Sequence, residues 1–451
     1  MMAGGLILLL AAVRLPSELK STPKAATATA SQLCVGVPCR ANADRRPARG
    51  YEVPSIAVDP QDPRHQVVGD ENLVGGRCGW HVTFDGGDTW TDGVFDIPPE
   101  YGKCTLDSAG LLPMGNVAMG ATGASVYAVF DARRAGLHGE AAGSGGEGIL
   151  LVTSTDGGKS FDTARPILPG GNPDLSYVRP QMIVSPSSEG VDRILLTAWG
   201  CGPGRCTTGY FIRSDDAGKT FTPPLLITPD PGGNSPSPPA IAADGTVYLT
   251  FLRRFDGGAT DLVVARSGDD GKTFDDVVVD KEPTIGIQYD SAKIVVDPGQ
   301  KDLYMVFADM RDNRPEVFFR RSRDKGTTWD RAVRLHTSPA GSAYSPAVSV
   351  APNGRIDVIF YRETRKNILD AHYTYSDDNG ASFALDQRLN DKTIDRELGY
   401  WAEVGDDSIP AVTSTNAAAY FAWSDTRDAT KVTNTQEILT KRIDFPKPTA
   451  P

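Results

Sequence analysis

Six copies of an eight-residue pattern run through most of this 451-residue chain and constrain its fold more than any other feature. The pattern is Ser/Thr-x-Asp-x-Gly-x-Thr/Ser-Trp/Phe, and its aspartates are Asp85, Asp156, Asp216, Asp269, Asp324 and Asp378. Successive aspartates are 71, 60, 53, 55 and 54 residues apart, which is about the length of one four-stranded sheet with its loops. A motif repeated at this period predicts an all-β propeller with one copy in each blade.

The chemistry of the pattern indicates a tight turn between two strands. Each copy follows a short strand-like run, as 148–153 precedes the copy at 154–161. The aspartate can accept hydrogen bonds from backbone amides a few residues ahead, and the glycine can adopt a positive φ without steric cost. The closing Trp or Phe can pack between neighbouring sheets. We therefore expect six structural staples of β-hairpins rather than six separate carboxylate sites.

This pattern resembles the Asp-box of sialidases and of the wider group of Asp-box (BNR repeat) propellers. The resemblance covers roughly residues 50 to 445 and implies boxes on the face away from the substrate. A seventh repeat opens at 408–412 and continues through 419–423 and 437–441, but it contains no box. Seven blades is the favoured count, and the alternative is six, the number usual for catalytic sialidases.

Composition supports a single large β domain over 48–446. The chain has 47 glycines and 33 prolines, which suits many short strands joined by tight turns, and no long stretch shows amphipathic helical periodicity. The formal net charge is −11, which argues against non-specific binding of nucleic acid.

The N-terminal segment indicates export, although incompletely. The apolar run at 6–13 is too short to span a bilayer, and small residues follow at 25–30. No Lys or Arg precedes the run, as a full secretory signal would require. We assign 1–30 as a candidate signal peptide, 31–47 as a linker and 447–451 as a tail, and expect a secreted or periplasmic protein with no membrane span.

Six cysteines are consistent with an oxidising compartment. They fall into the neighbouring pairs Cys34 and Cys39, Cys78 and Cys104, and Cys201 and Cys206. Three disulfides are the preferred interpretation. Zinc is the alternative, but neither of the two closest pairs has Cys-x-x-Cys spacing and the five histidines do not cluster with them.

Propellers usually bind ligands at one end of the central channel, where the innermost strands begin and the second strands end. If the strand order is sialidase-like, two residue sets share that face. The set at strand starts is Glu52, Asp107, Arg179, Tyr289, Asp290, Tyr344, Trp401 and Glu403. The set after second strands is Asp70, Glu71, Arg133, Arg134, Arg253, Arg254, Arg311, Arg362 and Arg427. Because the arginines recur from blade to blade, each can equally hold its own loop through carboxylates and carbonyls.

The sialidase resemblance implies a three-arginine carboxylate clamp, a Tyr nucleophile assisted by Glu, and an Asp acid/base. In sialidases the first clamp arginine lies in a Phe/Tyr-Arg-Ile-Pro motif, and the comparable stretch here is Tyr51-Glu52-Val53-Pro54. Glu52 therefore reverses the charge at the position that should meet the substrate carboxylate. Arg179, in Tyr177-Val178-Arg179-Pro180, has a similar local frame in a later blade.

We therefore expect a secreted, sialidase-like propeller related to glycoside hydrolases, acting on an extracellular glycan or glycoprotein that need not contain sialic acid. The candidate catalytic residues are Glu52, Asp107, Asp290, Tyr289, Tyr344 and Glu403. The candidate ligand-binding residues are Arg179, Arg311, Arg362 and Trp401. The alternative is a non-catalytic propeller that binds a glycan or protein. No cofactor motif is present, and calcium bound by channel carboxylates is a third hypothesis.

Overall fold

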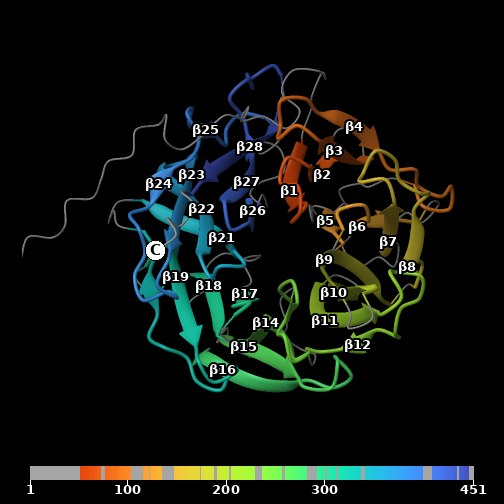
Figure 1. The fold of residues 1–451 in the computed structure, drawn as a ribbon, viewed down its shortest axis with the longest axis horizontal. Coiled ribbons are helices and arrows are strands. Elements are labelled where there is room, and N and C mark those ends of the chain that lie inside the picture. The colour runs from red at the N-terminus through yellow and green to blue at the C-terminus, as the bar shows by residue number, and fades with distance from the viewer. Residues whose placement is uncertain are drawn as a thin grey trace, which may run out of the picture.

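Seven antiparallel sheets stand in a ring around a central channel in the computed structural model (Figure 1). The structure describes residues 51–72, 77–102, 115–120, 122–134, 147–172, 174–186, 190–202, 205–228, 236–255, 260–281, 292–299, 302–310, 313–336, 341–399, 409–433 and 436–445. All regular elements within these ranges are strands. No helix that could cross a membrane occurs among the described residues.

Each sheet takes its strands consecutively from the chain. Blade 1 contains β1 (Tyr51–Val58), β2 (Gln66–Asn72), β3 (Arg77–Thr83) and β4 (Thr91–Val94). Blade 2 contains β5 (Gly115–Met119), β6 (Val126–Arg133), β7 (Glu147–Ser154) and β8 (Arg165–Leu168). Blade 3 contains β9 (Ser176–Pro186), β10 (Asp192–Gly202), β11 (Arg205–Ser214) and β12 (Leu225–Leu226). Blades 4 and 5 contain β13 (Ala240–Ile241), β14 (Val247–Arg254), β15 (Thr260–Ser267), β16 (Asp275–Lys281); and β17 (Lys293–Val296), β18 (Leu303–Asp309), β19 (Glu316–Ser322), β20 (Val333–Arg334).

The last two blades depart from the plain four-stranded form. Blade 6 contains β21 (Ser342–Val350), β22 (Ile356–Arg365), β23 (Ile368–Ser376), β24 (Gln387–Arg388) and an extra short strand, β25 (Ile394–Asp395), which pairs with β23. Blade 7 contains β26 (Ala411–Ser414), β27 (Ala418–Asp425) and β28 (Glu437–Asp444). The prediction of an all-β propeller with seven blades, the last without a box, is confirmed.

The ring closes by apolar packing between its first and last blades. Ile56 and Val68 of blade 1 form one buried cluster with Ala418, Tyr420 and Ile438 of blade 7. These side chains are nearly inaccessible to water, so their burial contributes to stability roughly in proportion to the apolar area they remove from solvent. Closure therefore rests on a hydrophobic interface between residues that are 350 or more positions apart in the chain.

All six boxes form the same hydrogen-bonded turn between the third and fourth strands of their blades. In the second box, Ser154 Oγ donates to Asp156 Oδ1 at 2.7 Å and accepts from Gly158 N–H at 2.8 Å. The carboxylate of Asp156 also accepts the backbone N–H of Ser160 at 3.0 Å and its hydroxyl at 2.6 Å. These hydrogen bonds from Ser160 lower the pKa of Asp156 to about 2. The structural role predicted for the boxes is confirmed.

The box glycine and the box aromatic residue also join neighbouring blades. Gly271, in the fourth box, has φ +78°, and a Cβ at this position would collide with the ring of Phe211 in blade 3. Phe274, which closes the same box, packs edge-on against Phe211 with ring centroids 5.2 Å apart. A glycine is therefore required both by the backbone conformation and by the space that the neighbouring ring occupies.

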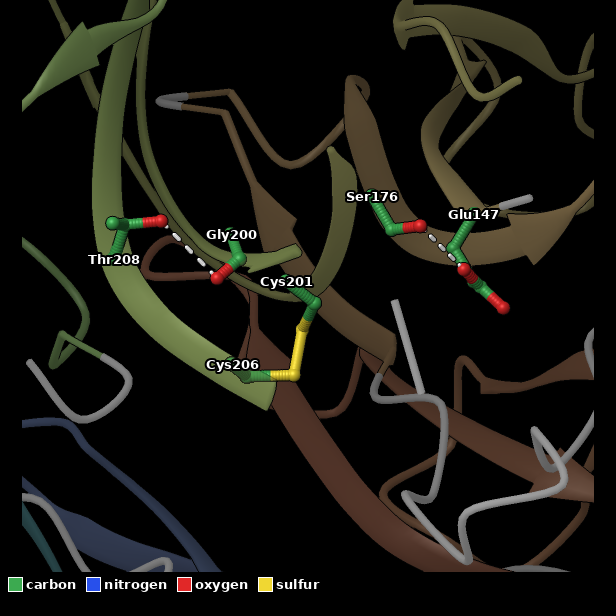
Figure 2. Close-up of a disulfide and its surroundings, with 6 residues drawn as sticks. All are labelled: Glu147, Ser176, Gly200, Cys201, Cys206 and Thr208. Atoms are coloured by element: carbon green, nitrogen blue, oxygen red, sulfur yellow. Dashed lines mark hydrogen bonds between the residues drawn. A yellow bond between two sulfur atoms is a disulfide. The ribbon is translucent and has the colours of Figure 1, made fainter. Parts of the chain in front are cut away.

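Blade 3 accounts for the wider gap between the boxes at Asp156 and Asp216. Its strands β9 and β10 have 11 residues each. Cys201 and Cys206 pair across the turn at the end of the long β10–β11 hairpin. The predicted Cys201–Cys206 disulfide is confirmed and joins β10 to β11 (Figure 2).

Of the other cysteines, Cys78 is also disulfide-bonded. Cys34, Cys39 and Cys104 lie outside the described residues.

Candidate functional site

The two faces of the ring are chemically different. The register pairs Ser176 with Cys201 and Ala343 with Arg362, so the innermost strands begin on the face where the second strands end. We call this the loop face. The opposite face, the box face, holds the six boxes and the turns between first and second strands, as shown by the 2.7 Å contact of His65 Nε2 with the carbonyl oxygen of Gly157. The strand order on which the sequence-based site depends is therefore present.

All seven blades contribute to a cavity of about 160 Å³ in the channel, six through their innermost strands and blade 4 through Pro238, which precedes β13. Its polar lining comes from Ser55, Asn116, Gln181 and Lys293. Two of these groups are used between blades: Ser55 Oγ accepts the N–H of Val117, and Asn116 Oδ1 accepts the N–H of Met182. Small-molecule sites usually span about 300–1,000 Å³, so the channel itself is too small for a sugar ring with its neighbours. A glycan ligand would have to lie above it, on the loop face.

A bulge interrupts the innermost strands of blades 1, 3 and 6 near the loop face. The register shifts between Glu52 and Ser55 in β1, opposite Ala198 in β10, and between Tyr344 and Ala347 in β21. Arg179 and Ser345 each precede a proline in such a bulge, and both have φ +52°. Left-handed backbone at a residue other than glycine is uncommon, and strained positions of this kind concentrate at functional sites.

The bulge places Arg179 inside the blade rather than at the channel surface. The residue is 2% exposed, and its guanidinium carbon lies 5.8 Å from the ring centroid of Trp199. In this conformation the side chain is not presented to solvent. Ligand binding by Arg179 remains a prediction, and it requires movement of the side chain or of the residues that bury it.

Tyr344, at the start of β21, is the one catalytic candidate whose side chain the structure describes. It is 3% exposed, and its hydroxyl oxygen lies 3.5 Å from Nη1 of Arg396. Arg396 belongs to the segment that contains β25, and this segment is held to blade 7 by Thr426: the Asp395 N–H donates to Thr426 Oγ1 at 2.9 Å, and that hydroxyl donates to the Asp395 carbonyl at 3.0 Å. Blades 6 and 7 together therefore position a guanidinium beside a phenol at the loop face.

Two of the described loop arginines, Arg362 and Arg427, are engaged by carboxylates of the protein. Arg362 Nη1 donates to Asp386 Oδ2 at 3.2 Å, and His372 Nδ1 lies 2.8 Å from the same oxygen. Arg427 forms two bonds with Asp425, at 3.1 and 2.9 Å, and its Nη1 lies 2.8 Å from Asp391. Such bidentate pairing fixes a guanidinium in one orientation. The architectural interpretation of these arginines thus accounts for their geometry, and ligand binding by Arg362 remains a prediction.

Sequence reasoning missed a layer of buried carboxylates beneath the loop face. Asp309 and Asp425 end their second strands and Asp131 lies two residues before the end of β6; Asp131, Asp309 and Asp425 are 6%, 1% and 1% exposed. Each stands two positions before an arginine, and this Asp-x-Arg spacing was the available signal. A further buried carboxylate, Glu147, accepts the hydroxyl of Ser176 at 2.6 Å and links blade 2 to blade 3 (Figure 2).

Asp70, one of the residues that the sequence places after a second strand, is buried with His81. Burial alone would lower the pKa of His81, but the carboxylates of Asp70 and Asp92 on its two ring nitrogens outweigh this and raise the pKa to about 9. His81 is therefore an imidazolium at neutral pH, and the three side chains form a closed charge network. This geometry supports a structural role for Asp70.

Several predicted site residues fall outside the described residues: Asp107, Tyr289, Asp290, Arg311, Trp401 and Glu403. For Glu52 the structure places the backbone in β1, paired with Glu71, and describes no side chain. Among the described residues, no three His, Cys, Asp or Glu side chains are arranged to hold a metal. The calcium hypothesis stays untested.

Comparison with known proteins supports the fold. A family model described as a BNR repeat-like domain matches residues 134–358. No curated protein matches the chain. A solved structure of a protein of unknown function from Dyadobacter fermentans has a TM-score of 0.51 at 16% identity, over 74% of this chain and 94% of that one.

Two further solved structures come from carbohydrate-active proteins. An ulvan lyase, a polysaccharide lyase, has a TM-score of 0.51 at 10% identity, over 88% of this chain and 97% of its own. A Hadza microbial sialidase has a TM-score of 0.49 at 16% identity, over 82% and 73%. At these identities the likeness concerns the fold.

Proposed function

The chain is a seven-bladed β-propeller built on Asp-box (BNR) repeats with a sialidase-like fold, and from this premise we propose that it acts on glycans at its loop face. The observation that carries the proposal is the Tyr344–Arg396 pair, which two blades hold at the start of an innermost strand. A guanidinium beside a phenol suits a sugar that carries an acidic group, because the neutral phenol does not repel it. The substrate need not be sialic acid.

The glutamate at the position of the first clamp arginine separates this proposal from a standard sialidase. Glu52 stands where the first clamp arginine would be, so the carboxylate of a sialoside would meet a negative charge there. We propose that recognition has moved toward blades 6 and 7, where Arg396 lies. Secretion or export, an extracellular glycan or glycoprotein partner, and relation to glycoside hydrolases form part of the same proposal.

A non-catalytic binding propeller is the second candidate, and one observation favours it. Three described carboxylates toward the loop face are neutralised within the protein: Asp425 by Arg427, Asp386 by Arg362, and Asp370 by Arg388 at 2.9 Å. A glycosidase acid or base would need a carboxylate with a perturbed pKa in an open pocket.

Hydrolysis of a panel of fluorogenic glycosides, a sialoside among them, by protein lacking residues 1–30 tests the proposal. We expect product release that falls about tenfold or more in Arg396→Gln and Tyr344→Phe, since the first removes the cation proposed to bind the acidic group and the second removes the buried hydroxyl beside that cation. Lys272→Gln, an exposed cation on the box face, serves as the control with unchanged rates.

Folded protein that is silent on the panel but binds a glycan array, with binding lost in Arg396→Gln, would establish the binding propeller. Activity or binding unaffected by both loop-face variants would overturn the assignment of the site to Tyr344 and Arg396.

A further inference from the structure

A groove of about 560 Å³ runs along the seam between blades 2 and 3, away from the channel. One wall is the outermost strand of blade 2, β8, and the other is the segment 219–224 that leads into β12. Its volume falls in the range of ordinary small-molecule sites, unlike that of the channel cavity. In Figure 1 the labels β8 and β12 lie at the outer edge of the ring.

Two exposed cations, Arg165 and Lys219, line this groove. Arg165 Nη2 is 3.7 Å from the point where a Cβ on Gly218 would stand, so its guanidinium reaches across the seam to the segment that begins at Lys219. No ion pair joins either of them to a carboxylate in the described part of the chain, and no carboxylate is among the lining residues. Nearby Arg193 and Arg213, by contrast, both pair with Asp215, at 3.0 and 2.9 Å.

Two exposed cations in one groove, with no acidic side chain among its lining residues, are unusual on a chain whose formal net charge is −11. Both cations attract an anion that enters the groove. Arginine and lysine side chains both form strong charge-assisted hydrogen bonds with carboxylate and sulfate oxygens.

The walls of the groove favour a sugar over a peptide. Pro166 and Pro169 lie on the β8 side, and Pro223 and Pro224 lie opposite. Proline has no N–H, so an extended peptide cannot add as a strand along β8 through a regular ladder. Recognition must come from side chains, and the half-buried ring of Phe221 offers an apolar surface next to the two cations.

We propose that this groove is a second binding site, which takes a segment of an acidic polysaccharide bearing carboxylate or sulfate groups. Arg165 and Lys219 bind the acidic groups, and Phe221 packs against the C–H face of a sugar ring. The site lies at the seam of blades 2 and 3, whereas Tyr344 and Arg396 belong to blade 6 and its extension. It therefore does not rest on the function proposed for the loop face.

Binding of four named probes by the folded full-length chain tests this proposal. The probes are polygalacturonate for carboxylate, dextran sulfate for sulfate, dextran as the neutral control and polyglutamate as an acidic peptide, each in affinity electrophoresis and calorimetry. The double variant Arg165→Gln/Lys219→Gln removes both cations. Its matched control, Lys272→Gln/Arg331→Gln, removes one lysine at the same position of another box and one exposed arginine elsewhere.

We expect at least one acidic polysaccharide to bind and dextran not to bind, with affinity about tenfold lower in the groove variant and unchanged in the control. The probe that binds identifies the acidic group. Equal loss in the two double variants would show general electrostatic attraction and overturn the site, as would unchanged binding in both. Polyglutamate binding as tightly as the polysaccharide, and lost in the same variant, would assign the groove to acidic peptides instead. Dextran binding as tightly as the acidic probes would overturn the role of charge.

Loss of glycosidase activity in loop-face variants leaves these outcomes unaffected, so the two proposals fail separately.

Discussion

His81 Nε2 lies 2.6 Å from Asp70 Oδ2, and both side chains are completely buried between the second and third strands of blade 1. The other ring nitrogen, Nδ1, lies 2.7 Å from Asp92 Oδ1. The second oxygen of Asp70 is buried and has no hydrogen-bond partner among the described residues. The charge on His81 is therefore what makes a buried carboxylate tolerable at this position.

This network predicts that stability falls at alkaline pH. The folded pKa of His81 is about 9, above its ordinary value of 6.5, so the contribution is complete below pH 6.5 and is lost as pH rises through about 9. Urea unfolding across this interval measures the loss. The double variant Asp70→Asn/His81→Gln should lose markedly less stability over the same interval, whereas an equal slope in both proteins would contradict the assignment.

The single variant His81→Gln should be far worse than that double variant at neutral pH. It leaves Asp70 buried without its cation, and breaking a buried pair in this way costs about 3–5 kcal/mol. The free energies of unfolding of the two variants, measured at about pH 7, make the comparison. A single variant as stable as the double would show that the pair is not coupled.

The boxes predict a second pH dependence, at the acidic end. The folded pKa of Asp156 is about 2, below its ordinary value of 3.8, so its contribution is present above pH 3.8 and is lost as pH falls toward 2. Asp156→Asn should lower the free energy of unfolding by about 1–2 kcal/mol at neutral pH, since it weakens several charge-assisted hydrogen bonds. It should also reduce the fall in the free energy of unfolding between pH 3.8 and about 2. Asp162→Asn, which changes an exposed aspartate just after the same box, should leave both quantities near wild type.

Two glycines of the fourth box provide a matched pair. Gly271 has a positive φ and faces the ring of Phe211, whereas a Cβ on Gly268 would meet no atom within 4 Å. Gly271→Ala should destabilise the protein by about 2 kcal/mol or more, because it adds both strain and a clash between blades. Gly268→Ala should be close to neutral. Thermal melting of the two variants makes the test, and equal melting temperatures would refute the account of the box glycine.

Blade 7 has no box, and Arg355 is expected to provide part of its attachment to blade 6. Its Nε donates to Asp357 at 3.0 Å, its Nη2 donates to the Thr415 carbonyl at 3.0 Å, and its guanidinium carbon lies 3.7 Å from the ring centroid of Phe445. Asp357 also accepts the hydroxyl of Ser414 at 2.7 Å. Arg355→Met should cost about 3–5 kcal/mol, because it leaves this buried carboxylate without its cation.

The exposed Arg365, in the same blade, is the control for Arg355. Arg365→Met should change the free energy of unfolding by less than about 0.5 kcal/mol. Similar losses in the two methionine variants would argue against a special role for Arg355.

The boxes were predictable because their chemistry is local. Asp156 accepts hydrogen bonds from both Ser154 and Ser160, which are only six positions apart. Residue type and spacing alone therefore indicate the turn. The repeat period then indicated the propeller, and the box-free repeat at the C-terminus indicated the seventh blade. The repeat pattern of the sequence did not, however, indicate β5, the innermost strand of blade 2.

The candidate site was only partly predictable. Strand order correctly placed Arg179, Tyr344 and Arg362 on one face. It did not indicate that a bulge turns Arg179 inward against Trp199, or that Asp386 engages Arg362. Arg396 was missed altogether, since nothing in its neighbourhood repeats in other blades.

The sequence by itself thus determined the repeating unit, the propeller architecture and the chemistry of the turns, because these depend on residues within a few positions of one another and on a regular period. The tertiary structure alone decided between six and seven blades, which arginine meets which carboxylate, how blades 1 and 7 close the ring, and that Arg165 and Lys219 line one groove whose described lining contains no acid. The physical reason is that the partners in these contacts lie tens to hundreds of residues apart. Their distance and burial follow from how the sheets twist and pack around the ring, and no local pattern records that geometry.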